Sequence, residues 1–283
     1  MDHLETAAAS LAAFVAAHPR LLVLTGAGCS TDSGIPDYRD ADGAWKHSRP
    51  VMYQDFVGRE ATRRRYWARS LVGWERIAAA EPNGAHRALA RLEAAGIVHH
   101  LVTQNVDGLH HRAGSRRVID LHGRLDVVHC LGCGTSISRA AFQAEIAARN
   151  PDFVGRLGSA TTRPDGDVDP GAIDYDAFDV PACSECGGVL KPGVVFFGEG
   201  VPPARVEAAF ARLAEADALL VVGSSLMVYS GYRFVQAAGR AGQPIAVVNL
   251  GRTRADAEVT LKIALPCIAV LDALEAALTP RVR

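Results

Sequence analysis

Short apolar runs alternate with longer stretches of helical periodicity along most of this chain. Runs of the length and composition typical of strands buried on both faces are residues 21–25, 97–103, 218–222 and 245–249. Shorter strands are expected at residues 118–121 and 194–197. Helices are predicted at residues 4–17, 61–80, 83–95, 203–214, 231–238 and in a last segment that ends at 278. Alternation of strands with helices predicts parallel βαβ units.

This alternation stops near residue 125 and resumes after residue 191. The interruption contains two Cys-x-x-Cys pairs and, between them, a long segment of mixed composition, residues 134–182. We therefore predict a doubly wound, Rossmann-like parallel α/β sheet built from residues 1–125 and 192–283, with a small inserted zinc-binding domain at 126–191. A loop rich in Gly, Pro, Asp and Arg at 34–50, with the helix after it, forms a further insertion at about 34–82.

Composition excludes several classes of protein. The 283 residues carry 30 Lys and Arg against 31 Asp and Glu, so there is no global basic field for nucleic acid. No apolar run reaches the length of a membrane span, and no basic cluster precedes the first apolar run as it does in a secretory signal. Four of the six cysteines form two close pairs, which suits metal binding in a reducing compartment. We expect a cytoplasmic protein that binds neither membranes nor nucleic acid.

A glycine turn, Gly26-Ala27-Gly28, directly follows the first apolar strand. Such turns let backbone amides approach a pyrophosphate, but the turn alone fits an ordinary tight turn equally well. Small and amide side chains at two later strand ends favour a nucleotide, because parallel strands present their carboxyl ends at one edge. Since no acidic residue follows the glycines at the usual distance, the ribose is expected to contact Ser224, Ser225 and Asn249.

Polar residues also follow the strand at 97–103. Gln104, Asn105 and Asp107 include residue types that often only cap a helix, but three of them at one strand end fit a pocket better. His122 ends the strand at 118–121 and precedes a glycine. A lone histidine is more often structural than catalytic, yet this position suits a general base.

The two cysteine pairs form a strong metal signal. Each pair supplies two thiolates from one tight turn, and two pairs complete a tetrahedral zinc site with no position left for water. One structural zinc ion is therefore predicted, bound by Cys130, Cys133, Cys183 and Cys186.

Seven ordered motifs together resemble the sirtuins, which are NAD-dependent protein-lysine deacylases. They are GAGCSTDSGIPDYRD, TQNVDGLH, LHG, the two CxxC pairs, KPGVVFFGE, GSSLMV and VNLG. The PDYR and YWAR segments and the long insertion further resemble class II members. The resemblance implies two substrates, NAD and an acylated-lysine protein or peptide, and three products: free lysine, nicotinamide and O-acyl-ADP-ribose.

The resemblance also implies roles for individual residues. His122 would be the general base, with Asn105 as a second catalytic residue. An added peptide strand would pair with Val195, Phe196, Phe197, Gly198 and Glu199. The cofactor would contact Gly26, Ala27, Gly28, Cys29, Ser30, Ile35, Pro36, Asp37, Tyr38, Arg39, Gln104, Asn105, Val106, Asp107, Gly223, Ser224, Ser225, Asn249, Leu250, Gly251 and Cys267.

Tyr66 and Arg69 resemble a Tyr-x-x-Arg pair that holds acidic acyl groups in desuccinylating sirtuins. A phenol and a guanidinium together suit a carboxylate. The alternative is a helix whose Tyr and Trp pack inward and whose Arg is solvated. The acyl group, the target protein and the oligomeric state stay open.

Two other functions were weighed. One is a protein mono-ADP-ribosyltransferase that uses the same NAD pocket, although His122 favours deacylation. The other is a non-catalytic zinc-ribbon adaptor, which would need a basic, aromatic surface near the cysteines. Residues 134–182 hold more acids than bases, which counts against the adaptor.

Overall fold

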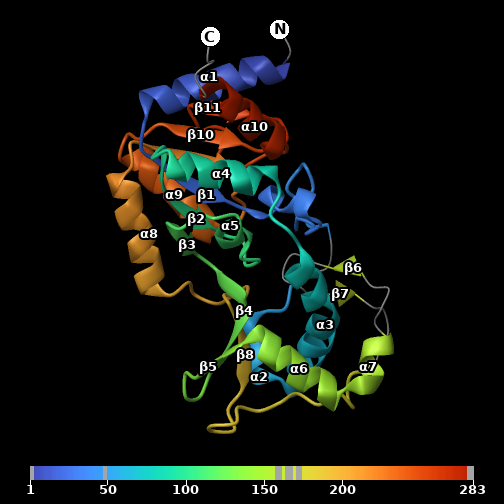
Figure 1. Ribbon diagram of the computed structural model, residues 1–283. Coiled ribbons are helices and arrows are strands. Elements are labelled where there is room, and N and C mark those ends of the chain that lie inside the picture. Colours follow the sequence, from blue (N-terminus) through green and yellow to red (C-terminus); the bar gives the residue numbers. More distant parts are fainter. Residues whose placement is uncertain (1–2, 47–49, 157–160, 163–167, 170–173, 279–283) are drawn as a thin grey trace.

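Two separate β-sheets organise the molecule, one toward each end of its long axis (Figure 1). The computed structural model describes residues 3–46, 50–156, 161–162, 168–169 and 174–278. The larger sheet has six strands, the smaller has three, and a two-stranded sheet is formed by β6 (Thr161–Thr162) and β7 (Val168–Asp169).

The six-stranded sheet is parallel throughout, with the order β11-β10-β9-β1-β2-β3. Its strands are β1 (Leu21–Thr25), β2 (Val98–Thr103), β3 (Val118–Asp120), β9 (Ala218–Val222), β10 (Ile245–Val248) and β11 (Leu261–Ile263). The strand order reverses between β1 and β9, as in dinucleotide-binding Rossmann sheets. The predicted doubly wound α/β fold is confirmed.

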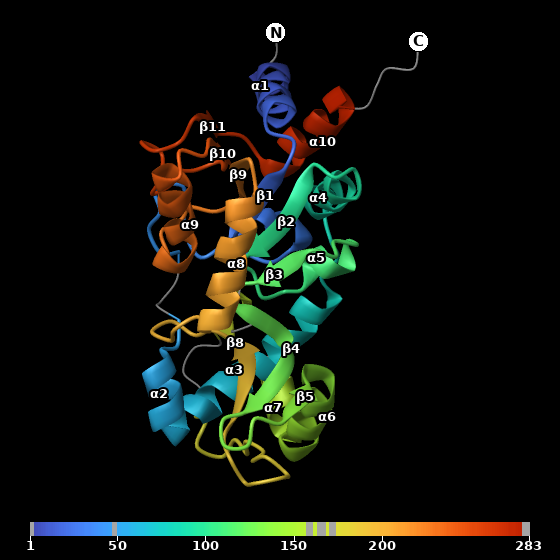
Figure 2. The ribbon, with the colours of Figure 1, turned by 90° about the vertical axis from the view of Figure 1, so that its left-hand side faces the viewer.

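Helices cover both faces of this sheet, which is why the central strands β1 and β9 are apolar except for Thr25. Leu21 and Val23 point into one core and Leu22 and Leu24 into another. The first core is covered by α1 (His3–Ala17), α4 (Gly84–Ala94) and α10 (Cys267–Leu278), and the second by α8 (Pro203–Glu215) and α9 (Tyr229–Arg240) (Figure 2). All five residues of β1 and of β9 are buried.

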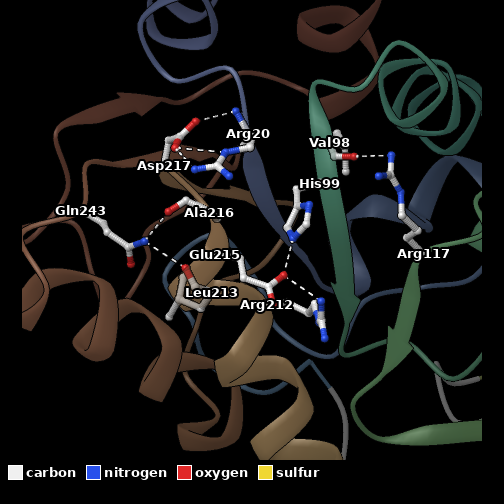
Figure 3. A network of polar contacts seen from close by, with 10 residues as sticks. All are labelled: Arg20, Val98, His99, Arg117, Arg212, Leu213, Glu215, Ala216, Asp217 and Gln243. Atoms are coloured by element: carbon white, nitrogen blue, oxygen red, sulfur yellow. Dashed lines mark hydrogen bonds and ion pairs between the residues drawn. The ribbon is translucent and has the colours of Figure 1, made fainter.

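Ion pairs and hydrogen bonds tie this sheet to the C-terminal end of α8 (Figure 3). Asp217, just before β9, accepts from the backbone and guanidinium of Arg20 at 2.9 Å. Glu215, the last residue of α8, accepts from Arg212 at 2.7 Å and lies 2.8 Å from His99 of β2. These contacts lie at the amino ends of the central strands and leave the opposite edge free for chemistry.

The smaller sheet is antiparallel, with β4 (Gly123–Cys130) between β5 (Ser136–Ser138) and β8 (Leu190–Val194). Around it lie α2 (Tyr53–Gly58), α3 (Glu60–Ala79), α6 (Arg139–Arg149) and α7 (Pro151–Arg156). Aromatic side chains dominate their shared core, and Trp67 packs on Phe142 with ring centroids 4.4 Å apart. The domain limits 126–191 stay a prediction.

The structure corrects part of the predicted strand pattern. The run 194–197 is not a strand of the parallel sheet: β8 ends at Val194 and pairs with β4, while Phe197 makes only a single parallel bridge to Met52. The edge strand β11 was not predicted. Part of the long insertion (157–160, 163–167 and 170–173) lies outside the described residues.

Among the helices of the described residues, none has the length and hydrophobicity that a membrane span requires.

The carboxyl ends of four parallel strands lie level with one another, because Thr25 is aligned with both Thr103 and Val222, and Val222 with Val248. Side chains that follow these strands are therefore brought together at one edge.

Candidate active site

A cavity of about 870 Å³ opens at the carboxyl edge of the parallel sheet, between it and the end of β8. This volume lies within the range of small-molecule and cofactor sites. Its walls come from the turn and loop after β1, the residues after β2, His122 after β3, the segment after β8, the residues after β9 and β10, and Pro266 and Cys267 after β11. The strand-end residues predicted to converge do so.

The glycine turn after β1 packs closely against the end of β9. The amides of Gly26 and Gly28 donate to the carbonyls of Val222 and Gly223 at 3.2 and 2.8 Å. A Cβ at Gly26 would lie 2.7 Å from that of Ser224, and one at Gly28 would lie 2.9 Å from the Gly223 oxygen. Glycine is therefore required at both positions for the close contact between the residues after β1 and those after β9. Their predicted contact with phosphate stays a prediction.

Ser30, Asn105 and Asp107 form one hydrogen-bonded group in the cavity wall. The Asn105 amide donates to the Ser30 hydroxyl at 2.9 Å, and Ser30 donates to the Asp107 carboxylate at 2.8 Å. Burial raises the pKa of Asp107, while hydrogen bonds from Leu109 and Ser30 oppose the shift. Each side chain is thus fixed in place, and Asp107 is a partly buried acid held by two hydrogen bonds.

Two buried histidines support this group from behind. His86 lies 3.3 Å from the Ser30 hydroxyl, and its ring completes a capping box with Asn83 at the start of α4. His110 Nε2 lies 2.9 Å from the Thr25 hydroxyl. Burial lowers the pKa of His86 to about 4 and that of His110 well below its usual value. Both rings are neutral structural groups at pH 7.

His122 lies in the cavity wall immediately before β4, and both of its ring nitrogens are engaged. Nδ1 lies 2.9 Å from the Gln104 carbonyl oxygen, and Nε2 lies 2.7 Å from the Ser230 hydroxyl. Burial lowers the pKa of His122 to about 4; the Gln104 bond raises it, and the charges of Arg205 and Arg233 lower it. The ring is therefore neutral at pH 7 and available as a base.

The segment after β8 forms the opposite wall. The Val195 amide donates to the carbonyl of His122 at 2.7 Å, which ties this segment directly to the candidate base. Glu199 accepts from the Phe196 amide at 2.8 Å and forms a 3.0 Å ion pair with Lys191, a side chain only 8% exposed. The segment leaves β8 at Val195 and turns back at Gly198, where the Glu199 amide donates to the Phe196 carbonyl at 3.0 Å. Its pairing with a peptide stays a prediction.

Aromatic side chains join the loop after β1 to this wall. Tyr38, Trp45 and Phe197 contact one another edge to face, with ring centroids 5.4 to 6.0 Å apart. The Arg39 guanidinium lies 4.1 Å from the centre of the Trp45 ring. The loop predicted to bind the cofactor therefore lies over the cavity and contacts the peptide side of it.

The four predicted zinc ligands lie together. Their sulfur atoms are all within 4.8 Å of one another, with Cys130 and Cys186 at 3.4 Å and Cys133 and Cys183 at 3.7 Å. Zinc–sulfur bonds of about 2.3 Å place tetrahedral sulfur atoms about 3.8 Å apart, so the set fits zinc. A Cβ on Gly188 would lie 2.9 Å from the Cys130 sulfur, so the close turn requires glycine there. His129 bonds to Ser136 instead.

Four predicted site residues do not line the cavity: Cys29, Pro36, Tyr66 and Arg69. Tyr66 is 1% exposed and packs edge to face on Phe196, which does line it. Arg69 is 9% exposed and is not the solvated arginine of the alternative. The pair lies behind the wall, so its role with an acidic acyl group stays a prediction. The other cofactor and peptide residues predicted from the sequence all line the cavity.

Several lining residues were missed, among them Trp45, Met227, Ser230 and Arg233. Three of these follow Ser225, where α9 begins at Tyr229, two residues before the predicted start. Leu226 adopts a left-handed backbone with φ 58°, which is unusual for a residue with a side chain. The sequence signal that could have revealed these lining residues is the run Tyr229-Ser230-Gly231, which follows the end of β9.

Comparison with known proteins identifies the family. The model of the Sir2 family matches residues 26–230. This chain belongs to the Sir2 family. It is 59% identical over 266 residues to an NAD-dependent protein deacetylase of Xanthomonas campestris pv. campestris, covering 94% of this chain and 90% of that protein. It is 58% identical to NAD-dependent protein deacetylase 2 of Bradyrhizobium diazoefficiens, covering 96% and 98%.

Solved Sir2 structures share the whole fold. One, described as Sir2 with a p53 peptide and NAD+, is 29% identical with a TM-score of 0.75, covering 95% of this chain and 97% of that one. Another, described as Sir2 with 2'-O-acetyl-ADP-ribose and deacetylated p53 peptide, is 26% identical with a TM-score of 0.75. The predicted resemblance to sirtuins is therefore confirmed along nearly the full chain.

Proposed function

We propose that this Sir2-family protein removes acyl groups from protein lysine side chains in a reaction that consumes NAD. One observation carries the proposal: a neutral histidine, His122, lies in a cavity lined on one side by converging strand ends and on the other by the segment that follows β8. The names of the relatives, all protein deacetylases, support acetyl-lysine as the first substrate to test.

The cavity fits NAD in size and in the groups that it presents. Ser30, Asn105 and Ser224 line it although they are only 1%, 9% and 5% exposed, so polar side chains are held in a largely dry site. Ser224 and Ser225 with Asn249 would hold the adenosine half. Ile35, Asn105 and Asp107 would hold the nicotinamide end, because an amide and a carboxylate suit a carboxamide.

When bound, NAD would supply an anomeric carbon that the acyl-lysine oxygen can attack as nicotinamide leaves, and phosphates whose charge would raise the pKa of His122. Asn105 and Asp107 keep fixed positions through their bonds with Ser30 and so orient what binds beside them. The segment from Val195 to Glu199 presents backbone groups along which an acyl-lysine peptide can lie as an added strand.

His122 would act as the general base. The Gln104 carbonyl can only accept a hydrogen bond, so Nδ1 carries the ring proton and Nε2 keeps its lone pair. Nε2 then takes the proton of a ribose hydroxyl, which frees that oxygen to attack the acyl carbon. Acyl transfer to the sugar, completed by one molecule of water, yields free lysine and O-acyl-ADP-ribose beside the nicotinamide already released.

Product analysis with labelled NAD tests this function. We expect an acetyl-lysine peptide and labelled NAD to give free-lysine peptide, nicotinamide and labelled O-acetyl-ADP-ribose in equal amounts. Reactions without NAD and with unacylated peptide are the controls. Label fixed on protein would support the ADP-ribosyltransferase instead, and no NAD-dependent loss of acetyl, succinyl, glutaryl or longer acyl groups would contradict the deacylase.

A further inference from the structure

The group in contact with the basic nitrogen of His122 is the side chain of Ser230. Its hydroxyl lies 2.7 Å from Nε2, and both residues line the cavity. Since the Gln104 carbonyl requires the proton to be on Nδ1, Nε2 of the neutral ring is an acceptor and Ser230 must be the donor. The two lone pairs of the serine oxygen then face away from its own proton and are free to accept another.

The contact of Gln104, just after β2, with the first turn of α9 positions the partners of both ring nitrogens of His122. Gln104, just after β2, provides the carbonyl for Nδ1, and its side chain donates to Ser224 at 2.7 Å. A Cβ on Gly231, the neighbour of Ser230 in the first turn of α9, would lie 2.5 Å from the Gln104 side-chain oxygen. This close approach sets the distance between Ser230 and the ring, so the hydrogen bond is part of the packing.

We propose that Ser230 is a catalytic residue that relays the proton to His122. The relay rests on the proposed function. Ser230 accepts the proton of a ribose hydroxyl at Oγ while its own hydroxyl proton moves to Nε2. The serine ends neutral, the imidazole ends as imidazolium, and the sugar oxygen keeps the electron pair with which it attacks the acyl carbon. One proton leaves the sugar and one arrives on His122.

Nitrogen NMR of protein labelled at histidine tests the hydrogen bond without any turnover. In the wild type, Nδ1 of His122 should be protonated and Nε2 should show the shift of a hydrogen-bonded acceptor. We expect Ser230→Ala to leave Nδ1 protonated and to move Nε2 toward the value of a nitrogen without a hydrogen bond. Ser230→Thr keeps a hydroxyl and should restore the shift. An Nε2 signal unchanged in Ser230→Ala contradicts the proposal.

Kinetics test the relay itself. Proton transfer by a positioned group contributes about 10²- to 10⁴-fold, so losing one relay step should lower kcat about 10- to 100-fold. KM for NAD and for peptide should change less than about twofold, because Ser230 acts on the proton and not on binding. Ser230→Thr should recover most of the rate. Equal kcat values in the wild type, Ser230→Ala and Ser230→Thr contradict the relay.

A double variant separates action through His122 from a general effect on the fold. If Ser230 acts through His122, adding Ser230→Ala to His122→Ala should lower the residual rate no further. An independent further loss contradicts the proposal. Absence of NAD-dependent turnover in the wild type would instead contradict the proposed function, while the NMR experiment would still report whether the Ser230 bond exists, so the two failures are distinguishable.

Discussion

The two sheets of this protein are stabilised in different ways. Every residue of β1 and β9 is buried, with helices covering both faces of the parallel sheet. The small sheet is less completely buried: all three residues of β5 are at least partly exposed, and the four predicted zinc ligands lie at its end. Because the cavity lies between the two sheets, catalysis needs both.

Loss of zinc should therefore have the largest effect, and mainly on one region. We expect Cys130→Ser or Cys183→Ser to release the zinc and to lower deacylase turnover more than about 100-fold, because the small sheet carries the peptide-binding wall and structural zinc contributes directly to folding. Metal content, turnover and hydrogen exchange measure this, with fast exchange in β4, β5 and β8 and continued protection in β1 and β9.

His129→Ala is the matched control, since His129 adjoins Cys130 but bonds to Ser136. It should keep one zinc ion per chain. Equal loss of protection in both sheets after Cys130→Ser would show that the two parts unfold as one unit and would contradict the comparison.

A second test concerns the aromatic core beside the small sheet. Arg139 is 1% exposed, lies 5.2 to 5.6 Å from three aromatic rings, and donates to the Ser70 carbonyl at 3.1 Å. Burial lowers its pKa to about 10. We expect Arg139→Ala to lower the free energy of unfolding by about 3 kcal/mol through lost packing, and Arg139→Met by less than about 1 kcal/mol. Urea unfolding measures both.

The ordering of these two variants is the informative result. If Arg139→Met costs as much as Arg139→Ala, the guanidinium, through its bond to Ser70 and its contacts with the aromatic rings, holds α3 to α6, and the apolar bulk of the side chain does not.

Lowering the pH should test the stability of the region built on the parallel sheet, because its buried histidines are neutral at pH 7. The pKa of His122 is about 4 in the folded protein and near 6.5 when unfolded, so the folded state binds fewer protons between these values. Stability therefore falls as pH falls from 6.5 toward 4, by about 1.4 kcal/mol per pH unit for this group, or about 2 kcal/mol at pH 5.

Comparing the wild type with His122→Asn isolates this effect, since the zinc site is the same in both. The free energy of unfolding of His122→Asn should fall less steeply with pH, by about one proton. Identical slopes between pH 6.5 and 5 would contradict a depressed pKa of His122.

Helix caps in the two regions give the smallest predicted effects. Asn83 caps α4 in the large part and also donates to the Cys29 carbonyl at 2.8 Å, whereas Ser138 caps α6 through one exposed bond of 3.1 Å. We expect Ser138→Ala to cost about 1 kcal/mol and Asn83→Ala about twice that, because a buried carbonyl also loses its partner. Thermal unfolding measures the pair. A larger loss of stability in Ser138→Ala than in Asn83→Ala would contradict this ranking of the two caps.

The same contrast explains what could be predicted from the sequence. The strands β1, β9 and β10 were identified because strands buried on both faces are apolar almost throughout, and β2 was identified although His99 and His100 interrupt its apolar run. The strand predicted at 194–197 lies instead at Leu190–Val194 as β8. Lys191, Pro192 and Gly193 interrupt its apolar pattern, and the apolar run that follows resembles a strand. Proline is tolerated there because β8 lies at a sheet edge. The edge strand β11 is short and contains Lys262, so no apolar run marks it.

The residues of the candidate site also fall into a group that the sequence predicts and a group that it does not. Residues directly after central strands, such as Asn105 and Ser224, were predicted because parallel strand ends converge. The Gly26 and Gly28 amides were assigned to phosphate, but their bonds to β9 depend on strand order, which the sequence did not show. Ser230 was missed because its partner, His122, is 108 residues away and only folding brings them together.

Turnover by His122→Ala, measured beside the wild type with NAD and an acetyl-lysine peptide, tests the central claim most directly. The wild type should form O-acetyl-ADP-ribose and free-lysine peptide in equal amounts. The variant, if folded and zinc-loaded, should lose kcat by about 10²-fold or more. A folded His122→Ala variant with the full wild-type rate would contradict the account.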